Sequence, residues 1–407
     1  MTNVPRAGTA RPRWEVADVF RLYGQAYRRS RALPSSHLKI MRAIEACRTA
    51  ALGGHLELCT DCGFRRPVYN SCRNRHCPKC QALAKAQWLQ AREEELLPVS
   101  YFHVVFTIPH ELNHLALRNK RVVYDILFRA VSQTLLQFGA DPDRGLGGTL
   151  GITAILHTWD QTLRDHIHLH CAVPGGALSQ DRHRWVSARP NFLFPVRALA
   201  QVFRGKFLDF LMQAFQDGEL AFSGKTEDLS AEPAFRGLLA RLYAKAWVVY
   251  SKRAFAGPRS VLDYFGRYTH RVAISNHRLL SVEGGTVTFS YRDRRDADKR
   301  KVMSLAADEF IRRFLLHAVP HSFMRVRHFG FLANRRKKDY LTRCRELLGL
   351  TADIQRSAPK ETAELVMDLT GEDLKACPCC ARGRMRVIGE LFPLRGVVFN
   401  GRSLDSS

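Results

Sequence analysis

Apolar residues at helical spacing open the chain and recur along its length. Between residues 14 and 46 they predict two short helices separated at Pro34, because proline disfavours a continuous helix there. The same spacing recurs further along the chain. It predicts helices over residues 83–97, 115–138, 197–216 and 233–250, and one opened by Pro258 that contains residues 261–269.

Shorter apolar runs are rich in β-branched and aromatic residues and are bounded by Pro or Gly. They predict a strand over residues 101–109 and a hairpin of two strands over 149–158 and 166–173. A second hairpin is predicted over 279–289, turning at Gly284 and Gly285. Helices and hairpins together predict an α+β fold around a modest antiparallel sheet.

The charge balance indicates the kind of partner. The chain has 407 residues, with 63 Lys and Arg against 38 Asp and Glu, which gives a formal charge of +25. Nucleic acid is therefore the first candidate partner and an anionic membrane the second. No apolar run approaches the roughly 18 residues of a spanning helix, and the N-terminus does not resemble a secretion signal. We expect a cytoplasmic protein without a membrane anchor.

Four regions follow from these patterns. We expect a helical segment over 1–46, a small metal-bound domain over 47–97, a central domain over 98–291, and a basic C-terminal region with a Cys-rich tail over 292–407.

Eleven cysteines in a cytoplasmic protein indicate metal ligands, because a reducing compartment keeps thiols free. Two C-x2-C knuckles, fourteen residues apart, predict one zinc ion held by four thiolates. Their ligands are Cys59, Cys62, Cys77 and Cys80. A second zinc site with two sulfur and two nitrogen ligands is an open alternative, as is a role purely in folding. Its ligands would be Cys47, His55, Cys72 and His76.

A further knuckle lies near the C-terminus, in Cys377-Pro-Cys379-Cys380, with Cys344 as a distant partner. No fourth ligand is evident for it in the sequence.

Histidines alternate with aliphatic residues in His166-Ile-His168-Leu-His170. In a strand the three imidazoles project from one face, which suits a metal, although a purely structural role is the alternative. His157, on the preceding strand, is the candidate for a further ligand. Imidazole favours zinc or manganese over magnesium, but these ligands alone do not determine the metal.

Tyr264 and Tyr268 are four residues apart and share one face of a predicted helix. Packing in a core is the alternative for such a pair, but Arg267 and Arg271 make this helix cationic. A histidine-held metal beside a tyrosine hydroxyl suits cleavage of a DNA phosphodiester through a 5′-phosphotyrosine.

These motifs resemble the double-tyrosine HUH transposases of bacterial insertion sequences, which move by rolling-circle transposition. The resemblance runs from about Cys47 to about Arg345. It is carried by the cysteine knuckles, by the segment from His157 to Gln161, by His168-Leu-His170-Cys-Ala-Val-Pro-Gly-Gly, and by Tyr264-x3-Tyr268.

The resemblance implies an HUH-type central antiparallel sheet with flanking helices and an N-terminal zinc-binding domain. It also implies Mg²⁺ or Mn²⁺ at the catalytic site, and single-stranded or hairpin DNA ends of a mobile element as substrate. His168 and His170 would be metal ligands, and Tyr264 and Tyr268 nucleophiles. Because Ile167 stands where proline is expected, His166 and His168 also satisfy the HUH pattern.

Two other functions stay open. One is a plasmid replication initiator or relaxase with the same chemistry, and the other is a zinc-dependent DNA-binding protein without catalysis. The sequence also predicts DNA-contacting cations. They are Arg73, Arg75, Arg267, Arg271, Arg335, Arg336, Lys337 and Lys338. Phe323, Phe329 and Phe331 either stack on bases or belong to the core.

Overall fold

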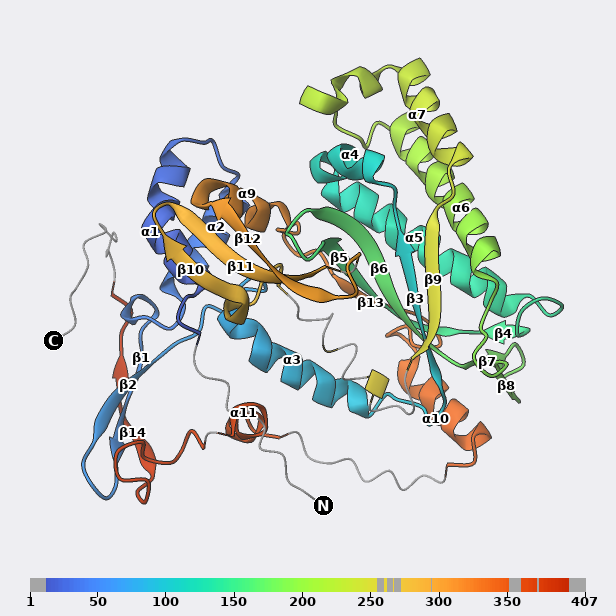
Figure 1. Cartoon of the computed structure of the whole chain (residues 1–407). Coiled ribbons are helices and arrows are strands. Elements are labelled where there is room, and N and C mark those ends of the chain that lie inside the picture. The colour runs from blue at the N-terminus through green and yellow to red at the C-terminus, as the bar shows by residue number, and fades with distance from the viewer. Residues whose placement is uncertain are drawn as a thin grey trace.

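A five-stranded antiparallel sheet lies at the centre of the computed structural model (Figure 1). The structure describes residues 12–254, 260, 261, 266, 272–293, 295–350, 360–371 and 373–394. The strand order is β13 (Val326–Gly330), β5 (Gly151–Trp159), β6 (Asp165–Pro174), β3 (Tyr101–Thr107) and β9 (Val248–Ala254). With its flanking helices, this sheet confirms the predicted α+β class.

One face of the central sheet forms the main core of the protein. On β6 the odd-numbered residues Ile167, Leu169 and Cys171 are fully buried, as alternation along a strand requires when one face is covered. The covering helices are α5 (Lys120–Ala140) and α6 (Val196–Gln216), whose apolar residues belong to the same cluster.

The opposite face of the same sheet carries the histidines. Near them, Tyr101, Ile155, Ala172 and Val261 form a small buried cluster, against which Trp88 of helix α3 (Pro78–Glu93) packs. The two faces of this sheet therefore differ. One packs into the main apolar core, and the other carries buried histidines next to a small apolar cluster.

A second, smaller layer joins the N-terminal helices to a segment between residues 279 and 316. Strands β10 (Leu279–Glu283), β11 (Thr286–Asp293) and β12 (Lys299–Ala306) form an antiparallel sheet. It shares a core with α1 (Val16–Arg29), α2 (Ser35–Ala46) and α9 (Ala307–Leu316). The predicted turn between β10 and β11 is confirmed, since Gly284 and Gly285 adopt the positive φ angles that favour glycine.

A third sheet is made of β14, β1 and β2, and stands apart from the central sheet (Figure 1). Strand β1 (Gly54–Cys59) pairs with β2 (Arg65–Tyr69) on one side and with β14 (Met385–Leu391) on the other. A C-terminal strand is therefore built into the N-terminal cysteine-rich region.

The remaining elements are short or peripheral. They are α4 (Asn113–Arg118), α7 (Glu232–Ala244), α10 (Lys337–Leu347), α11 (Thr362–Thr370), β4 (Gly148–Thr149), β7 (Gly176–Ser179), β8 (Trp185–Ser187) and the 3-10 turns Ala50–Leu52, His110–Leu112, Gly224–Ser230 and Asn276–Arg278.

Several predicted elements differ from the observed ones. The helix predicted over 233–250 ends at Ala244, and its last residues belong to edge strand β9. A run such as Trp247 to Tyr250 fits either period, and pairing with β3 decides the outcome. The sequence patterns do not predict strands β1, β2, β7, β8, β12, β13 and β14. Most of the helix predicted over 261–269 lies outside the described residues.

The aromatic residues of the C-terminal region belong to the core. Phe323 and Phe331 are at most 1% exposed, and the partly buried Phe329 packs against the main cluster. A base cannot stack on a fully buried ring, so the base-stacking alternative is wrong for Phe323 and Phe331.

Substitution of Phe106 tests how much the main core contributes to the stability of the protein. Its ring packs edge to face against Phe203 of α6, with 5.1 Å between centroids, and is fully buried. Phe106→Ala is expected to lower the free energy of unfolding by about 3–5 kcal/mol, measured by urea denaturation. Phe192→Ala, at a residue 45% exposed, is the matched control and should change it by less than about 1 kcal/mol.

Candidate active site and cysteine clusters

Three histidines meet on the polar face of the central sheet. His157 of β5 is paired in register with His168 of β6, and His170 lies two residues further along β6. One ring nitrogen from each lies within 4.8 Å of those of the other two, and all three side chains are buried. The Nε2 atoms of His168 and His170 are 3.0 Å apart. Three converging imidazoles are a suitable donor set for a divalent transition metal.

Hydrogen bonds orient two of these rings. His168 Nδ1 donates to the carbonyl oxygen of His166 at 2.8 Å, and its Nε2 is directed at His170. His170 Nδ1 lies 2.8 Å from Nε2 of His103, a buried residue of β3. Metal-binding histidines are typically held in this way through the second ring nitrogen.

His103 was missed by the sequence analysis. Its only signal is a polar residue within the apolar run 101–109, which is too weak to find it. Antiparallel pairing of β3 with β6 places His103 opposite Ala172, one step from His170 on the same face. Tertiary pairing alone brings these rings together.

His166 lies on the same face but outside the group of three. Its side chain is exposed at the start of β6, and its ring centroid is 4.6 Å from that of His168. Of the two pairs that fit the HUH pattern, the structure brings His168 and His170 together with His157.

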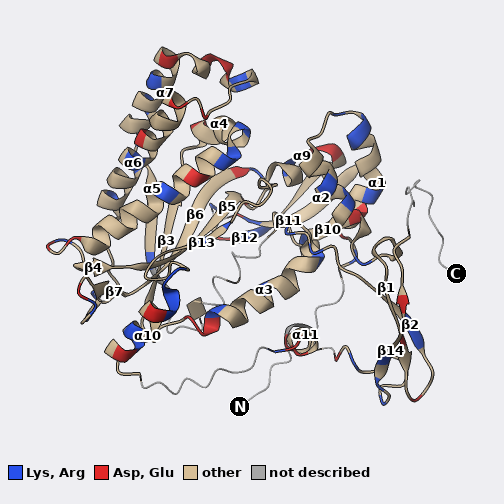
Figure 2. Cartoon of the chain, turned by 180° about the vertical axis from the view of Figure 1, so that it is seen from behind, with Lys and Arg blue, Asp and Glu red and all other residues tan. Residues whose placement is uncertain are grey.

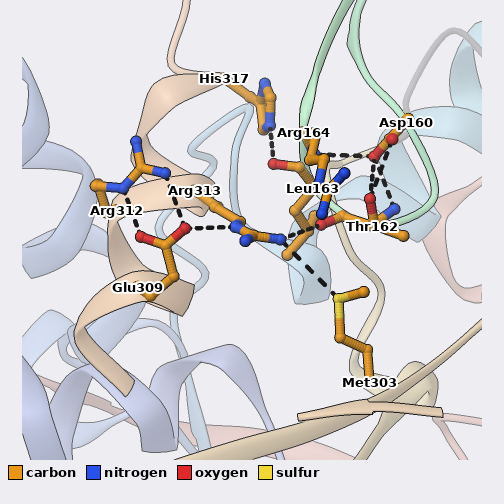
Figure 3. A network of polar contacts seen from close by, with 9 residues as sticks. All are labelled: Asp160, Thr162, Leu163, Arg164, Met303, Glu309, Arg312, Arg313 and His317. Atoms are coloured by element: carbon orange, nitrogen blue, oxygen red, sulfur yellow. Dashed lines mark hydrogen bonds and ion pairs between the residues drawn. The ribbon is translucent and has the colours of Figure 1, made fainter. Parts of the chain in front are cut away.

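The turn between β5 and β6 is held by helix α9 and the residues that follow it (Figure 3). Asp160 accepts hydrogen bonds from the backbone N–H groups of Thr162 and Arg164. Arg313, which also pairs with Glu309, donates to the Thr162 carbonyl oxygen. These bonds fix the turn of the β5–β6 hairpin, whose two strands carry the three histidines.

His317 extends this network to His157. Its Nε2 donates to the Leu163 carbonyl oxygen at 3.2 Å, and its Nδ1 lies 3.3 Å from the Thr158 hydroxyl. The His317 ring contacts Trp159, which in turn stacks on His157 at 4.9 Å between centroids. Burial lowers the pKa of His317 to about 4, so the ring is neutral near pH 7.

Tyr264, Tyr268, Arg267 and Arg271 lie outside the described residues. Two described residues that are near them in sequence, Val261 and Gly266, lie close to the face of the central sheet that carries the histidines. Val261 belongs to the buried cluster of Ile155 and Ala172, which are two residues from His157 and His170 on the same strands. Gly266 lies against α3, where an added Cβ would come 2.7 Å from Cε of Lys85.

The cysteines form two groups of four. In the first, Sγ of Cys80 lies 3.6 Å from that of Cys47 and 3.7 Å from that of Cys72. Its members are Cys47, Cys72, Cys77 and Cys80. In the second group two Sγ pairs are each 3.7 Å apart. Its members are Cys59, Cys62, Cys377 and Cys380. Each group has the composition of a structural zinc site.

The predicted pairing of the two N-terminal knuckles is therefore wrong. Cys59 ends β1, and Cys62 lies in the turn that follows, whereas Cys77 and Cys80 come after β2 has returned along β1. Because β1 has six residues, at about 3.3 Å each, the two knuckles lie at opposite ends of the hairpin. Spacing in the sequence does not show this.

The two predicted nitrogen ligands belong to neither group. His55 Nε2 lies 3.3 Å from a carboxylate oxygen of Glu57. His76 is packed near Arg75 and Arg325, and burial together with these charges lowers its pKa to about 3. A second site of two sulfurs and two nitrogens is thus wrong.

Cys344, proposed as a partner of the C-terminal knuckle, instead packs in an apolar cluster with Phe331 and Leu341. Burial raises its pKa to about 12, which disfavours the thiolate that a metal requires.

The predicted DNA-contacting cations have different environments. Arg73, Arg335, Arg336 and Lys338 are exposed. In contrast, Lys337 forms an ion pair with Glu95, and Arg75 donates to the Phe323 carbonyl oxygen at 2.6 Å. Figure 2 shows Lys and Arg on helices as far apart as α1, α6 and α10, so the net charge is spread over the molecule.

Comparison with known proteins agrees with this arrangement. Residues 19–108 match a family described as "Transposase zinc-binding domain", and residues 151–339 match one described as "Putative transposase". The chain is 51% identical to "Putative transposase y4qJ" of Sinorhizobium fredii over 97% of this chain and 98% of that relative. It is 30% identical to "Transposase for insertion sequence element IS801" of Pseudomonas savastanoi pv. phaseolicola, covering 74% and 72%.

The chain belongs to the IS91/IS801-type transposases. The match to the zinc-binding domain includes all four cysteines of the first group and the first two cysteines of the second group. The match over residues 151–339 includes the three histidines of this transposase. No solved structure matches the chain. In the described part of this transposase, no helix is both long and apolar enough to cross a membrane.

His317 is expected to make the stability of this transposase depend on pH. Its pKa is about 4 in the folded chain against 6.5 ordinarily, so the unfolded chain binds the proton more tightly. The contribution of His317 to stability is complete above pH 6.5 and is lost as pH falls toward 4. Between pH 7.5 and 5 this amounts to about 2 kcal/mol.

The measurement is the free energy of unfolding in urea at the two pH values. His317→Gln should show a smaller loss between pH 7.5 and 5 than the wild type, whereas His321→Gln, at an exposed site, should keep the wild-type loss. Equal losses in the wild type and His317→Gln would contradict the assignment.

Proposed function

We propose that this transposase nicks and rejoins single-stranded DNA at the ends of its insertion sequence through a covalent tyrosine intermediate, which drives rolling-circle transposition. The observation that carries the proposal is the convergence of His157, His168 and His170 on one sheet face, with two of the rings held through Nδ1. Such a preorganised set of nitrogen donors is costly in a buried surface unless it binds a cation.

The three imidazoles would hold the catalytic metal, Mn²⁺ or Mg²⁺. Bound there, a divalent cation polarises the scissile phosphodiester and stabilises charge on its oxygens. The all-nitrogen donor set is softer than the oxygen ligands that Mg²⁺ prefers, so Mn²⁺ fits this site better. The chain's own contribution is to fix the ring orientations, through His103 and the His166 carbonyl oxygen.

The nucleophile in this proposal is Tyr264 or Tyr268. The phenol gives up its proton and its oxygen attacks phosphorus, the bond to the 3′ oxygen breaks, and that oxygen takes up a proton to become a free 3′-OH, so no net proton is gained or lost. Rejoining is the reverse attack by a 3′-OH, so no nucleotide cofactor is consumed. A second tyrosine permits a second cleavage while the first tyrosine is still linked to DNA.

Chain connectivity supports this assignment. Val261 packs beside the histidine-bearing positions of β5 and β6, and Tyr264 follows three residues later. In addition, Gly266, between the two tyrosines in sequence, lies against α3, the helix that packs on the same small cluster.

DNA contacts are proposed for the exposed cations. Arg73 lies beside the first cysteine group, and Arg335, Arg336 and Lys338 lie at the start of α10. Exposed guanidinium and ammonium groups on rigid elements suit phosphate contact, which positions a strand without reading its sequence. The tail of cations after Arg292 would add to the salt dependence of binding.

The tyrosine assignment is tested by covalent attachment. Wild-type protein with Mn²⁺ and single-stranded DNA from the element's ends should form an adduct that survives denaturation. Tyr264→Phe/Tyr268→Phe should abolish it, and His168→Ala/His170→Ala should reduce it at least 100-fold. Gel shift of labelled adducts, with mass mapping of the modified tyrosine, is the measurement.

Tyr243→Phe is the matched control, at an exposed tyrosine of α7, and should form the adduct normally. All variants should still bind DNA with the wild-type salt dependence. Binding without an adduct in the wild type, under every metal, would favour a non-catalytic DNA-binding protein, and attachment to a plasmid origin but not to element ends would favour an initiator.

His103 is expected to position His170. His103→Phe removes the polar partner of His170 Nδ1, so the apparent Mn²⁺ affinity for adduct formation should fall about 10–100-fold. Because only the affinity is affected, excess Mn²⁺ should restore most of the activity. His110→Phe, at a histidine whose side chain is 84% exposed, should leave the Mn²⁺ dependence unchanged. A loss that excess Mn²⁺ cannot rescue would indicate a purely structural role for His103.

A further inference from the structure

We propose that Cys59, Cys62, Cys377 and Cys380 form a second structural zinc site, which fastens the C-terminal segment to the N-terminal zinc-binding domain. The two pairs are separated by more than 300 residues of chain. Cys377 and Cys380 lie outside both matched family regions, which end at residues 108 and 339. The site is independent of the proposed catalytic function.

The sulfur geometry suits zinc. Cys59 and Cys380 have their Sγ atoms 3.7 Å apart, as do Cys62 and Cys377, and all four lie within 4.8 Å. Tetrahedral zinc with Zn–S bonds of about 2.3 Å separates its sulfurs by about 3.8 Å. A disulfide requires about 2.05 Å, so neither pair is one.

Backbone amides support the charge of the thiolates. Cys59 Sγ accepts a hydrogen bond from the N–H of Asp61, and Cys380 Sγ accepts one from the N–H of Gly383. Cys377 Sγ accepts one from the N–H of Cys379. Amides directed at sulfur are the usual surroundings of zinc knuckles, because the ligands must be deprotonated.

Close packing joins the two knuckles. A Cβ on Gly383 would lie 2.3 Å from Cys59 Sγ, so a residue with a side chain does not fit there. Just beyond it, β14 pairs with β1 from Met385 opposite Cys59 to Leu391 opposite Gly54.

An apolar core does not account for this attachment. Among the described residues after 350, the buried hydrophobic side chains are Leu365, Cys377 and Met385. The local cluster contains only Cys59, Cys377 and Met385, with Cys380 packed against it. So small a core rarely holds a segment by itself, and a metal is the usual substitute.

The attachment has a structural consequence near the active site. Helix α11, which precedes Cys377, packs against α3, and α3 packs on the histidine-bearing side of the central sheet. Zinc at the second site therefore holds α11 where it braces α3.

Alkylation of the wild-type protein tests the site directly. Cys62 and Cys379 are both exposed, so iodoacetamide reaches either one unless a metal protects it. In zinc-loaded full-length protein, mass spectrometry should find Cys379 modified and Cys62, Cys377 and Cys380 protected. A strong chelator should remove this protection. Modification of Cys62 at the rate of Cys379 before chelation would overturn the proposal.

Zinc content and amide hydrogen exchange test whether the second zinc site attaches the C-terminal segment to the N-terminal zinc-binding domain. Cys377→Ser/Cys380→Ser should bind one zinc fewer per chain than the wild type, with faster amide exchange in β14 and α11. Cys379→Ser is the matched control and should keep the wild-type zinc content and exchange. Unchanged zinc content in the double variant would overturn the site, and lost zinc with unchanged exchange in β14 would overturn the fastening role. Neither readout depends on DNA cleavage.

Discussion

The antiparallel pairing of β5 with β6 is the interaction on which the candidate active site depends. It sets His157 opposite His168 and puts Ile167 and Leu169 into the core on the other face. A shift of one residue would turn the histidines into the core and the aliphatic residues onto the opposite face. The buried aliphatic face therefore specifies the register, and the register assembles the ligands.

Much of the structure around this hairpin preserves that register. The 160–164 turn is capped by Asp160 and bonded to Arg313 and His317, so the second layer, which contains α1, α2, β10–β12 and α9, packs against this end of the hairpin. His103 on β3 contacts His170 from the opposite side. Because the rings are held by neighbouring strands and by the turn, the proposed metal site would need little movement to bind its ion.

The cysteine-rich region follows a different physical rule. Its β1–β2 hairpin is mostly half-exposed and cannot form a core of its own. Four-cysteine groups at its two ends take the place of that core, one shared with helices α2 and α3 and the other with the C-terminal tail. The protein thus combines a conventional core beneath the histidines with four-cysteine junctions where the chain is polar.

Alternation along residues 166–170, the C-x2-C knuckles and the Gly284-Gly285 turn could all be interpreted from the sequence, because each depends on contacts a few residues apart. The helices and hairpins predicted from local patterns indicated the α+β class, and the motifs carried the resemblance to the transposase family. The grouping of the cysteines, the role of His103, and the change from helix to strand at Val248 depend on pairing between distant segments, so only the tertiary structure decided them. Local spacing determines which chemical groups are available and which way a strand presents them. Which groups meet is decided by the packing of strands and helices far apart in the chain.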